Sequence, residues 1–430
     1  MRLIDAETLE LTTTIGDDPP PYAIVSHTWS DDEITLADYD NPSSRSSRAF
    51  EKVRSACSVA RGLGLYYIWI DTCCIDKESS AELSEAINSM YQWYAQARHC
   101  IVYLADVTRN VIGARAFEAE FRKTRWFTRS WTLQELIAPQ RLTFLSADWN
   151  VLGTRDELAA LIASITRIPE ACILQRHLAR GSSVAQIFSW ASGRRATRGE
   201  DRAYSLLGLL DVNIPLLYGE GAAKTFRRLQ LEIIRESSDE SIFAWRSGDA
   251  LGLPDEVALS SMLAVSPESF SSSGDVVPAS VYPFTDRAPY RYTNKGLEFE
   301  IRRLVSDAHD ALSDPTHGRA GTQDSFVVPL NCRREGDANS VLALTFKRYP
   351  FLLSSSQLVV GRQHHSLDSI KLSAPEVQEV VSQRIMVAGW RQANKMREVG
   401  DPRSRAQGPG SSNRRVLSQE DASSQRVLSI

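Results

Sequence analysis

Four short apolar runs in the first 150 residues each end abruptly in polar residues. The runs are YAIVSH (22–27), YYIWID (66–71), CIVYLADV (100–107) and RLTFLSADW (141–149). Runs that are apolar throughout are typical of parallel strands covered on both faces. We therefore predict strands near 22–27, 66–71, 100–105 and 141–146, all of which bring polar groups to one rim of a sheet.

The segments between these runs have apolar residues at helical spacing. Residues 49–61 and 81–97 each place apolar side chains on one face, and the short segment 130–138 is stopped by Pro139. Alternating strands and helices predict an α/β fold with a mostly parallel, doubly wound sheet. Open sheets of this kind bind ligands at the carboxyl ends of their strands. The polar strand ends therefore predict a site at this edge.

The remaining sequence changes in character twice. Residues 151–245 are helical without strands and are expected to pack on the sheet of residues 1–150, so that 1–245 forms one domain. Residues 255–390 consist of short β-prone segments separated by polar turns, which indicates a β-rich second domain. Residues 391–430 are rich in Ser, Arg, Gln and Gly with little to bury, which predicts a disordered tail.

The composition narrows the class of partner and the cell compartment. The net charge of −4 gives no electrostatic reason to expect nucleic acid or an anionic membrane as a partner. The N-terminus has no signal-peptide pattern, and no stretch reaches the ~18 apolar residues of a membrane helix. The six scattered cysteines are typical of reduced thiols. We expect a cytoplasmic protein without a membrane span.

Several longer segments, taken together and in this order, resemble the fungal heterokaryon incompatibility (HET) domain. They are YAIVSHTW (22–29), YYIWIDTCCIDK (66–77), FRKTRWFTRSWTLQELIAP (121–139), RGEDRAYSLLGLL (198–210) and LYGEGAAKTFRRLQ (217–230). The resemblance covers about 1–245, with Ser130 standing where many relatives have glycine. It implies a role in the cell death that follows fusion of incompatible fungal cells. It also implies self-association and partners among other incompatibility or signalling proteins.

HET domains are in turn similar to TIR domains, flavodoxin-like modules of which some cleave NAD. The resemblance therefore implies a flavodoxin/TIR-like core, with NAD as a possible substrate and no bound cofactor. The catalytic glutamate of those enzymes follows the third strand in a Trp-Cys-x-x-Glu-Leu type pattern. The segment WTLQEL (131–136) follows the third predicted strand here and is similar to that pattern. The resemblance thus implies Glu135 as the catalytic residue.

Glu135 has a second interpretation that the sequence leaves open. Cleaving nicotinamide from ribose requires stabilisation of an oxocarbenium-like cation, which one carboxylate supplies, and Trp131 could stack on a planar heterocycle. However, Thr132-x-x-Glu135 is also the spacing of a capping box. In that case Glu135 would only close the start of its own helix.

The first predicted strand ends in Ser26, His27 and, two residues on, Trp29, beside Asp71 of the second strand. We take these four residues as candidates for substrate binding. His27 could hydrogen-bond a ribose or phosphate, or it could pair with Asp71 and stabilise the loops. Ser26 and His27 point to opposite faces of an extended strand, so a hydrolase triad with Asp71 is not expected.

Three other motifs have structural explanations. Cys73 and Cys74 are adjacent and lack C-x-x-C spacing, which favours buried thiols over a metal site. Gly219-Glu220-Gly221 lacks the lysine and the preceding strand of a phosphate loop, so we interpret it as a helix start. Residues 194–202 carry Arg194, Arg195, Arg198 and Arg202 with Glu200 and Asp201 among them, which indicates a mixed-charge surface or an internal salt-bridge network.

Two functions of different classes fit the sequence. In the first, the protein is a death effector that hydrolyses NAD when it assembles. In the second, it is a non-enzymatic module that transmits non-self recognition through protein contacts. Both predict the same fold, so only activity distinguishes them.

Overall fold

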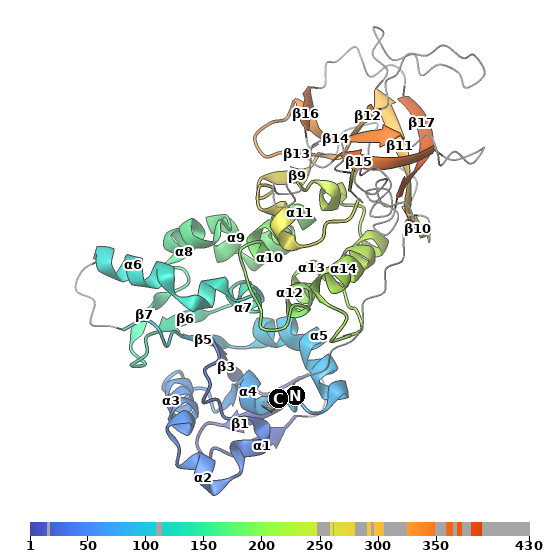
Figure 1. Cartoon of the computed structure of the whole chain (residues 1–430). Helices are drawn as coiled ribbons and strands as arrows, with labels where there is room; N and C mark the ends of the chain where they lie inside the picture. Colours follow the sequence, from blue (N-terminus) through green and yellow to red (C-terminus); the bar gives the residue numbers. More distant parts are fainter. Residues whose placement is uncertain are drawn as a thin grey trace, which may run out of the picture.

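The computed structural model describes most of the first 246 residues and separate segments of the remainder. The described residues are 1–14, 18–108, 114–246, 259–260, 262–279, 290–293, 296–304, 325–348, 358–363, 368–371 and 380–388. Figure 1 shows three successive parts: an N-terminal sheet with its helices at one end, a group of helices in the middle and later strands at the other end.

A seven-stranded sheet forms the N-terminal part. In their order across the sheet, the strands are β2 (Leu11–Thr13), β1 (Arg2–Asp5), β4 (Tyr67–Trp69), β3 (Tyr22–His27), β5 (His99–Tyr103), β6 (Leu142–Leu145) and β7 (Val151–Thr154). The four central strands β4, β3, β5 and β6 are parallel, and the outer pairings are antiparallel. The sheet is therefore parallel at its centre and mixed overall.

The first parallel strand lies between the second and the third. Ala23 of β3 is in register with Ile68 of β4 on one side and with His99 of β5 on the other. All six residues of β3 are buried, which explains its continuous apolar run. After β3 the chain first adds β4 along one edge of β3 and then crosses over to add β5 along the other edge. The two connections therefore lie on opposite sides of the carboxyl end of β3. Open α/β sheets bind ligands at such a switch point.

Helices and single turns connect these strands. They are α1 (Leu36–Tyr39), α2 (Pro42–Arg45), α3 (Arg48–Gly62), α4 (Asp71–Cys74), α5 (Ser80–Gln96), α6 (Ala114–Lys123), the 3₁₀ turn η1 (Arg125–Thr128) and α7 (Thr132–Ile137). Helix α3 begins where the Ser47 side chain accepts a hydrogen bond from the Phe50 amide, and it buries Phe50, Val53 and Cys57. The predicted helices at 49–61 and 81–97 are confirmed, and α7 is shorter than the predicted segment.

Residues after β7 form the helical extension, which we define as residues 159–246. Its elements are α8 (Ala159–Thr166), α9 (Glu170–Leu174), α10 (Arg176–Arg180), α11 (Val184–Ala191), α12 (Asp201–Tyr204), α13 (Leu207–Leu210), α14 (Ala222–Glu236) and the 3₁₀ turn η2 (Glu240–Phe243). Helix α13 packs directly on α5, since a Cβ atom at Gly208 would lie 2.0 Å from the Cβ of Tyr91. The extension is thus part of the core of the N-terminal half.

The interpretation of Gly219-Glu220-Gly221 as a helix start is confirmed. Helix α14 begins immediately after Gly221, whose φ is +87°. The amides of Gly219 and Gly221 both donate to the carboxylate of Glu200 at 2.9 Å. A protein carboxylate therefore occupies the position that an anion would take in a phosphate loop.

The later residues form β-strands and one 3₁₀ turn. They are η3 (Pro267–Phe270), β8 (Leu259–Ser260), β9 (Val276–Pro278), β10 (Arg291–Thr293), β11 (Gly296–Leu304), β12 (Ser325–Pro329), β13 (Cys332–Arg334), β14 (Ser340–Arg348), β15 (Leu358–Gln363), β16 (Asp368–Lys371) and β17 (Val380–Ala388). Strands β9 and β13 pair, and the others form one sheet that is antiparallel except between β15 and β17. The Ser183 hydroxyl donates to the Val276 carbonyl at 2.6 Å and joins the extension to β9.

The four strands predicted from the apolar runs are confirmed as β3, β4, β5 and β6. The sequence analysis did not predict β1, β2 and β7, which add antiparallel edges to the sheet. The predicted β-prone segments within 255–390 appear as β-strands where the structure describes them. The predicted tail at 391–430 lies outside the described residues, and the domain boundaries stay a prediction.

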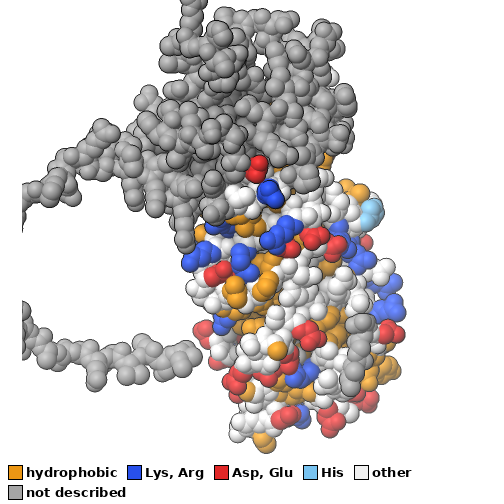
Figure 2. Space-filling model, turned by 90° about the vertical axis from the view of Figure 1, so that its right-hand side faces the viewer, with side chains coloured by type: hydrophobic (Ala, Val, Ile, Leu, Met, Phe, Trp, Pro, Cys, Tyr) orange, Lys and Arg blue, Asp and Glu red, His pale blue; other side chains and the backbone are white. Residues whose placement is uncertain are grey.

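Two features of the described chain bear on its surroundings. None of the described helices is both long and apolar enough to cross a membrane. Over the described part of the face in Figure 2, acidic and basic side chains are interspersed among apolar ones. This face therefore carries charges of both signs, as the small net charge of −4 indicates.

Candidate functional site

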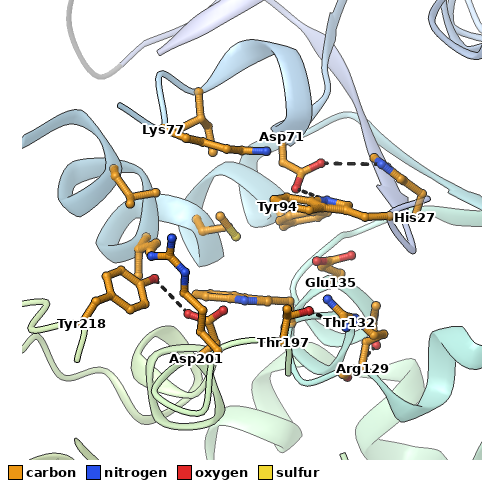
Figure 3. A pocket seen from close by; sticks show the side chains of 17 residues that line it. His27, Asp71, Lys77, Tyr94, Arg129, Thr132, Glu135, Thr197, Asp201 and Tyr218 are labelled. Carbon is orange, nitrogen blue, oxygen red and sulfur yellow. Dashed lines mark hydrogen bonds and ion pairs between the residues drawn. The ribbon is translucent and has the colours of Figure 1, made fainter. Parts of the chain in front are cut away.

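A pocket of about 240 Å³ lies at the carboxyl ends of β3 and β4. One wall comes from the sheet and its connecting helices (residues 1–154, here called the sheet domain). It consists of residues at and after the ends of these two strands, one face of α5 from Leu83 to Tyr94, and the segment 129–135. The opposite wall comes from the helical extension and consists of Thr197, Arg198, Asp201 and Tyr218. Figure 3 shows side chains from both parts of the chain facing a common space. The pocket is therefore shared between two regions far apart in sequence.

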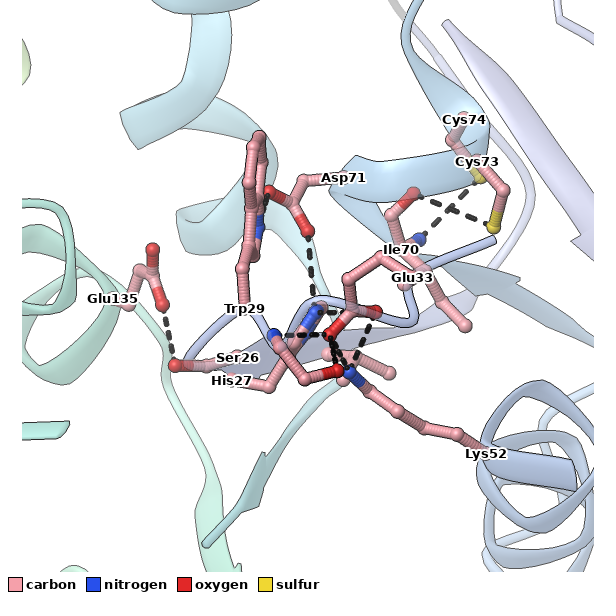
Figure 4. Close-up of polar contacts among 12 residues, drawn as sticks. Ser26, His27, Trp29, Glu33, Lys52, Ile70, Asp71, Cys73, Cys74 and Glu135 are labelled. Atoms are coloured by element: carbon pink, nitrogen blue, oxygen red, sulfur yellow. Dashed lines mark hydrogen bonds and ion pairs between the residues drawn. The ribbon is translucent and has the colours of Figure 1, made fainter. Parts of the chain in front are cut away.

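Glu135 lies on the floor of this pocket. It is on α7, lines the pocket and is only 7% exposed. The Ser26 hydroxyl donates to its Oε2, and the Trp126 indole donates to Ser26 Oγ at 2.7 Å. Ser26 is fully buried and does not line the pocket. Ser26 was predicted to be part of the pocket surface. It instead lies beneath that surface and donates a hydrogen bond to Glu135, as Figure 4 shows.

The surroundings of Glu135 favour its protonated form. Burial raises the pKa of Glu135 to about 8, and the negative charge of Asp71 acts in the same direction. The hydrogen bond from Ser26, the Tyr94 hydroxyl and the charge of Arg129 oppose this rise. At pH 7 this favours the neutral form of Glu135. A raised carboxyl pKa in a cleft is a feature of catalytic sites, although buried structural groups share it.

The capping-box interpretation of Glu135 is wrong. Trp131 is the N-cap residue of α7, and no side chain caps the helix there. The Thr132 hydroxyl donates instead to the carbonyls of Trp126 and Arg129, at 2.5 and 2.9 Å. The Glu135 carboxylate is bonded to Ser26 on β3, so it is directed at the sheet edge and away from the start of its own helix.

Asp71, Trp29 and His27 meet at the pocket edge. The Trp29 indole donates to Asp71 Oδ2 at 2.8 Å, and His27 Nε2 lies 3.9 Å from Asp71 Oδ1. His27 Nε2 is also 3.5 Å from Glu33 Oε2, and Glu33 forms an ion pair of 2.6 Å with Lys52. Although burial opposes it, His27 and Lys52 lower the pKa of Glu33 well below its usual range. His27 thus lies between two carboxylates, which fits the pairing interpretation.

The structure separates Ser26 from His27, as the strand geometry requires. Figure 4 shows Ser26 reaching Glu135 while His27 points toward Glu33 and Asp71. His27, Trp29, Asp71 and Trp131 all line the pocket with Glu135. The structure therefore brings five of the six candidate residues onto one surface, with Ser26 directly behind it.

We predicted that all four parallel strands bring polar groups to one site at the sheet edge, and this holds for β3 and β4 but not for β5 and β6. Among the described residues, none of those directly at the carboxyl end of β5 (104–107) or of β6 (146–149) lines the pocket. Asp106, which follows β5, accepts hydrogen bonds from the Thr124 hydroxyl at 2.5 Å and from the Arg125 amide at 2.7 Å. Its carboxylate therefore fixes the start of η1. The strand ends that reach the pocket are therefore those of β3 and β4, through His27 and Asp71.

The extension holds the loop that carries Glu135. The buried Arg194 guanidinium donates to the Arg129 carbonyl and to the Thr132 hydroxyl, both at 3.0 Å. Burial lowers the pKa of Arg194 to about 10, so the group stays charged at neutral pH. The Ser130 amide also donates to the Arg195 carbonyl at 2.8 Å. The charges of residues 194–202 are thus divided between a buried clamp at Arg194 and the pocket wall at Arg198 and Asp201.

The pocket residues of the extension were not predicted. The Tyr218 hydroxyl donates to Asp201 Oδ1 at 2.9 Å, and Arg198 lies over the Tyr218 ring. Burial raises the pKa of Asp201, although the hydrogen bond from Tyr218 opposes this. Only the resemblance over 198–210 and 217–230 singled out these segments in the sequence. Spacing alone could not show that they face the sheet edge.

Cys73 and Cys74 are buried, as the sequence predicts. The hydrogen bond with Cys74 and burial together raise the pKa of the Cys73 thiol well above its ordinary value. The described part of the chain contains no group of three or more His, Cys, Asp or Glu side chains placed to hold a metal ion. The two cysteine side chains lie on α4, directly after β4, and fill the core there as small apolar groups.

Comparison with known proteins supports the resemblance seen in the sequence. Residues 22–118 match the family model described as heterokaryon incompatibility protein (HET). The match includes Ser26 and Asp71 and ends before Glu135. The chain is also 43% identical over 224 residues to the vegetative incompatibility protein HET-E-1 of Podospora anserina.

The aligned region is half of this chain and 16% of that relative, so this chain spans only a small part of the relative's length. No solved structure matches the chain. The family match falls on β3, β4 and β5, the strands at and beside the switch point, and the relative aligns with half of the chain. On this evidence the chain carries a HET-family region within residues 22–118 and is homologous over half of its length to a vegetative incompatibility protein.

Proposed function

We propose that this protein acts in vegetative incompatibility, as an effector of the death of incompatible fungal cells that hydrolyses NAD in the pocket around Glu135. It would act in the cytosol after assembling with itself or with other incompatibility or signalling proteins. The role in incompatibility is supported by the 43% identity to a vegetative incompatibility protein.

The enzymatic part rests on one observation, the buried carboxyl group of Glu135 at the floor of a pocket lined by Trp29 and Trp131. Breaking the bond between nicotinamide and ribose develops positive charge on the sugar. A carboxylate beside the anomeric carbon stabilises that charge, as in glycoside hydrolysis. The tryptophans offer surfaces for a planar heterocycle. A bound nicotinamide cation would also favour the ionised form of Glu135.

The order of the strands supports a flavodoxin/TIR-like assignment for the core. Along the chain, the four parallel strands lie across the sheet in the order second, first, third, fourth. This is the order of flavodoxin-like folds, whose ligand lies at the switch point between the first and third strands. Glu135 follows the third parallel strand, at the place where the TIR enzymes carry their glutamate.

The alternative is a non-enzymatic signalling module. The high pKa of Glu135 favours it, because a neutral carboxyl stabilises a developing cation poorly. The matched region is also only 16% of the relative's length, as expected of a module that works within larger proteins. In this case the pocket would bind a ligand or a peptide without chemistry.

Hydrolysis is tested with the purified protein. We expect release of nicotinamide from NAD at protein concentrations high enough to force assembly, and a loss on the order of 10²–10³ in rate in Glu135→Gln. The control is Glu118→Gln, which makes the same change at an exposed position on α6. No release by the wild type, or equal rates in both variants, would contradict the enzymatic proposal.

A cellular experiment separates the two functions. Residues 1–246 are overproduced in a fungal cell, and viability and NAD content are followed together. Toxicity with NAD depletion, both abolished by Glu135→Gln in a variant that still folds, supports hydrolysis. Toxicity with unchanged NAD supports the signalling module.

A further inference from the structure

Two positively charged side chains at the pocket lie on aromatic rings. Lys77 Nζ is 3.6 Å from the centre of the Trp29 ring, and the Arg198 guanidinium carbon is 4.4 Å from the centre of the Tyr218 ring. Each ring is held by a carboxylate, Trp29 by Asp71 at 2.8 Å and Tyr218 by Asp201 at 2.9 Å. The two arrangements are alike in all three parts: carboxylate, ring and cation.

These two arrangements belong to opposite walls. Figure 3 shows Lys77 and Asp71 on one side of the space and Tyr218 and Asp201 on the other. The first set belongs to the sheet domain and the second to the helical extension. Each ring attracts the cation that lies over it, which favours the observed position of Lys77 and of Arg198.

Neither cation forms a close side-chain contact with an acid among the residues that the structure describes. The side chains of Lys77 and Arg198 form no ion pair within 4.0 Å and no hydrogen bond there, although Asp71 acts on Lys77 and Arg198 acts on Asp201 through their charges. The nearby carboxylates already accept hydrogen bonds from the rings. Burial lowers the pKa of Lys77, although Asp71 opposes this. An anion placed between the two side chains would accept hydrogen bonds that they do not make to the described residues.

The depth of the pocket separates these cations from Glu135. The Trp29 side chain, on whose ring Lys77 lies, is 45% exposed, whereas the Glu135 side chain on the pocket floor is only 7% exposed. The pocket volume of about 240 Å³ is below the ~300–1,000 Å³ of sites that enclose a drug-sized ligand. A pocket of this volume is too small to enclose a whole dinucleotide, so part of such a ligand would lie at the mouth.

We propose that Lys77 and Arg198 form a subsite for the pyrophosphate of a dinucleotide at the pocket mouth. This inference rests on the proposed function, since it takes the ribose and its leaving base to be the part that reaches Glu135. The subsite makes the pyrophosphate a determinant of substrate choice. Nicotinamide riboside, which has no phosphate, reaches the same floor without this contact.

Hydrolysis kinetics test the subsite through substrate preference. We expect Lys77→Gln and Arg198→Gln each to lower kcat/KM for NAD by about tenfold, mainly through KM, because each removes a charge-assisted contact. Their kcat/KM for nicotinamide riboside should be unchanged, and Lys77→Arg and Arg198→Lys should recover most of the loss. The controls are Lys123→Gln and Arg122→Gln, which make the same charge changes at exposed positions on α6. Equal losses for both substrates would overturn the proposal.

A binding measurement makes the test independent of catalysis. ADP-ribose and, separately, inorganic pyrophosphate are titrated calorimetrically into Glu135→Gln, alone and combined with Lys77→Gln or Arg198→Gln. We expect about tenfold weaker ADP-ribose binding in each combination and a strong dependence on salt. If neither the wild type nor any variant releases nicotinamide, the hydrolysis proposal fails. This titration then decides by itself whether the subsite binds a pyrophosphate. Unchanged ADP-ribose affinity in both combinations would show that the cations only stack on their rings.

Discussion

The direction of the Ser26 hydroxyl is fixed by its two neighbours. The Trp126 indole can only donate, so Ser26 Oγ accepts from it at 2.7 Å and gives its own proton to Glu135. This hydrogen bond stabilises the ionised carboxylate and lowers the pKa of Glu135 against the effect of burial. Ser26 is therefore a positioning residue that also adjusts the charge of Glu135.

We expect Ser26→Ala to raise the pKa of Glu135 above its value of about 8, because the opposing hydrogen bond is removed. Trp126→Phe should raise it less, because the Ser26 hydroxyl remains but is free to rotate. The measurement is an NMR titration of the Glu135 carboxyl carbon, assigned with Glu135→Gln. Ser164→Ala, at an exposed position on α8, is the control. An unchanged titration in Ser26→Ala would show that the contact does not affect the pKa.

Glu135 also makes stability depend on pH. Its pKa is near 4.3 in an unfolded chain and about 8 in the folded protein, so between these values the folded state binds more protons. The free energy of unfolding should therefore fall as pH rises from about 4 to about 8, by at most about 1.4 kcal/mol per pH unit from this group. Glu135→Gln has no such group, so the wild type should lose stability relative to it across this range.

Urea unfolding at several pH values from 5 to 9 measures this difference. Glu118→Gln serves as the control, because an exposed glutamate on α6 should leave the pH dependence of the wild type intact. If the curves of the wild type and Glu135→Gln run parallel, Glu135 is not the buried titrating group that the structure indicates.

The sequence located the sheet side of the site but not its other wall. His27 and Asp71 were found because they end adjacent parallel strands, and Glu135 because WTLQEL resembles a known pattern. Trp126 was not found, since one indole in an aromatic-rich segment gives no sign of its partner. Tyr218 and Arg198 were not found because their place in the pocket depends on how α12 and the loop before α14 pack, which local pattern does not encode.

At the scale of elements, predictability followed burial and length. Strand β3 is buried at all six positions, and such a run has one interpretation. Strands β2 and β7 have three and four residues and are partly exposed, too short for any periodicity to be recognised. Helix α4 is a single turn that begins at Asp71 without a side-chain cap, so the sequence showed a strand end there and no helix.

Among the described glycines, Gly208 of α13 makes the closest approach to a neighbouring element, which is α5. A Cβ atom at Gly208 would lie 2.0 and 2.6 Å from Cβ and Cγ of Tyr91. Gly208→Ala should therefore push α13 away from α5 and lower the free energy of unfolding by about 1–3 kcal/mol, despite the better helix propensity of alanine. Chemical denaturation measures this. Gly193→Ala, where nothing lies within 4 Å of the added Cβ, should cost much less.

At the scale of the molecule, the pocket exists only when the sheet and the helical extension are joined. The sheet supplies Glu135, and the extension supplies Asp201, Tyr218 and the Arg194 clamp on the loop before α7. The extension also covers α5 through α13. We therefore expect the core of 1–150 and the extension to behave as one folding unit, because neither half alone completes the pocket.

If the core of 1–150 and the extension fold together, fragments of the chain should differ in stability and activity. Residues 1–246 should unfold in one cooperative transition and keep whatever nicotinamide release the whole protein has. Residues 1–150 should lack that transition, because α5 and α7 expose apolar faces in water and the Arg129 and Thr132 contacts to Arg194 are lost. Thermal unfolding and nicotinamide release are measured for both fragments. A cooperative 1–150 fragment with full activity would show that the extension is an accessory to the site and not a wall of it.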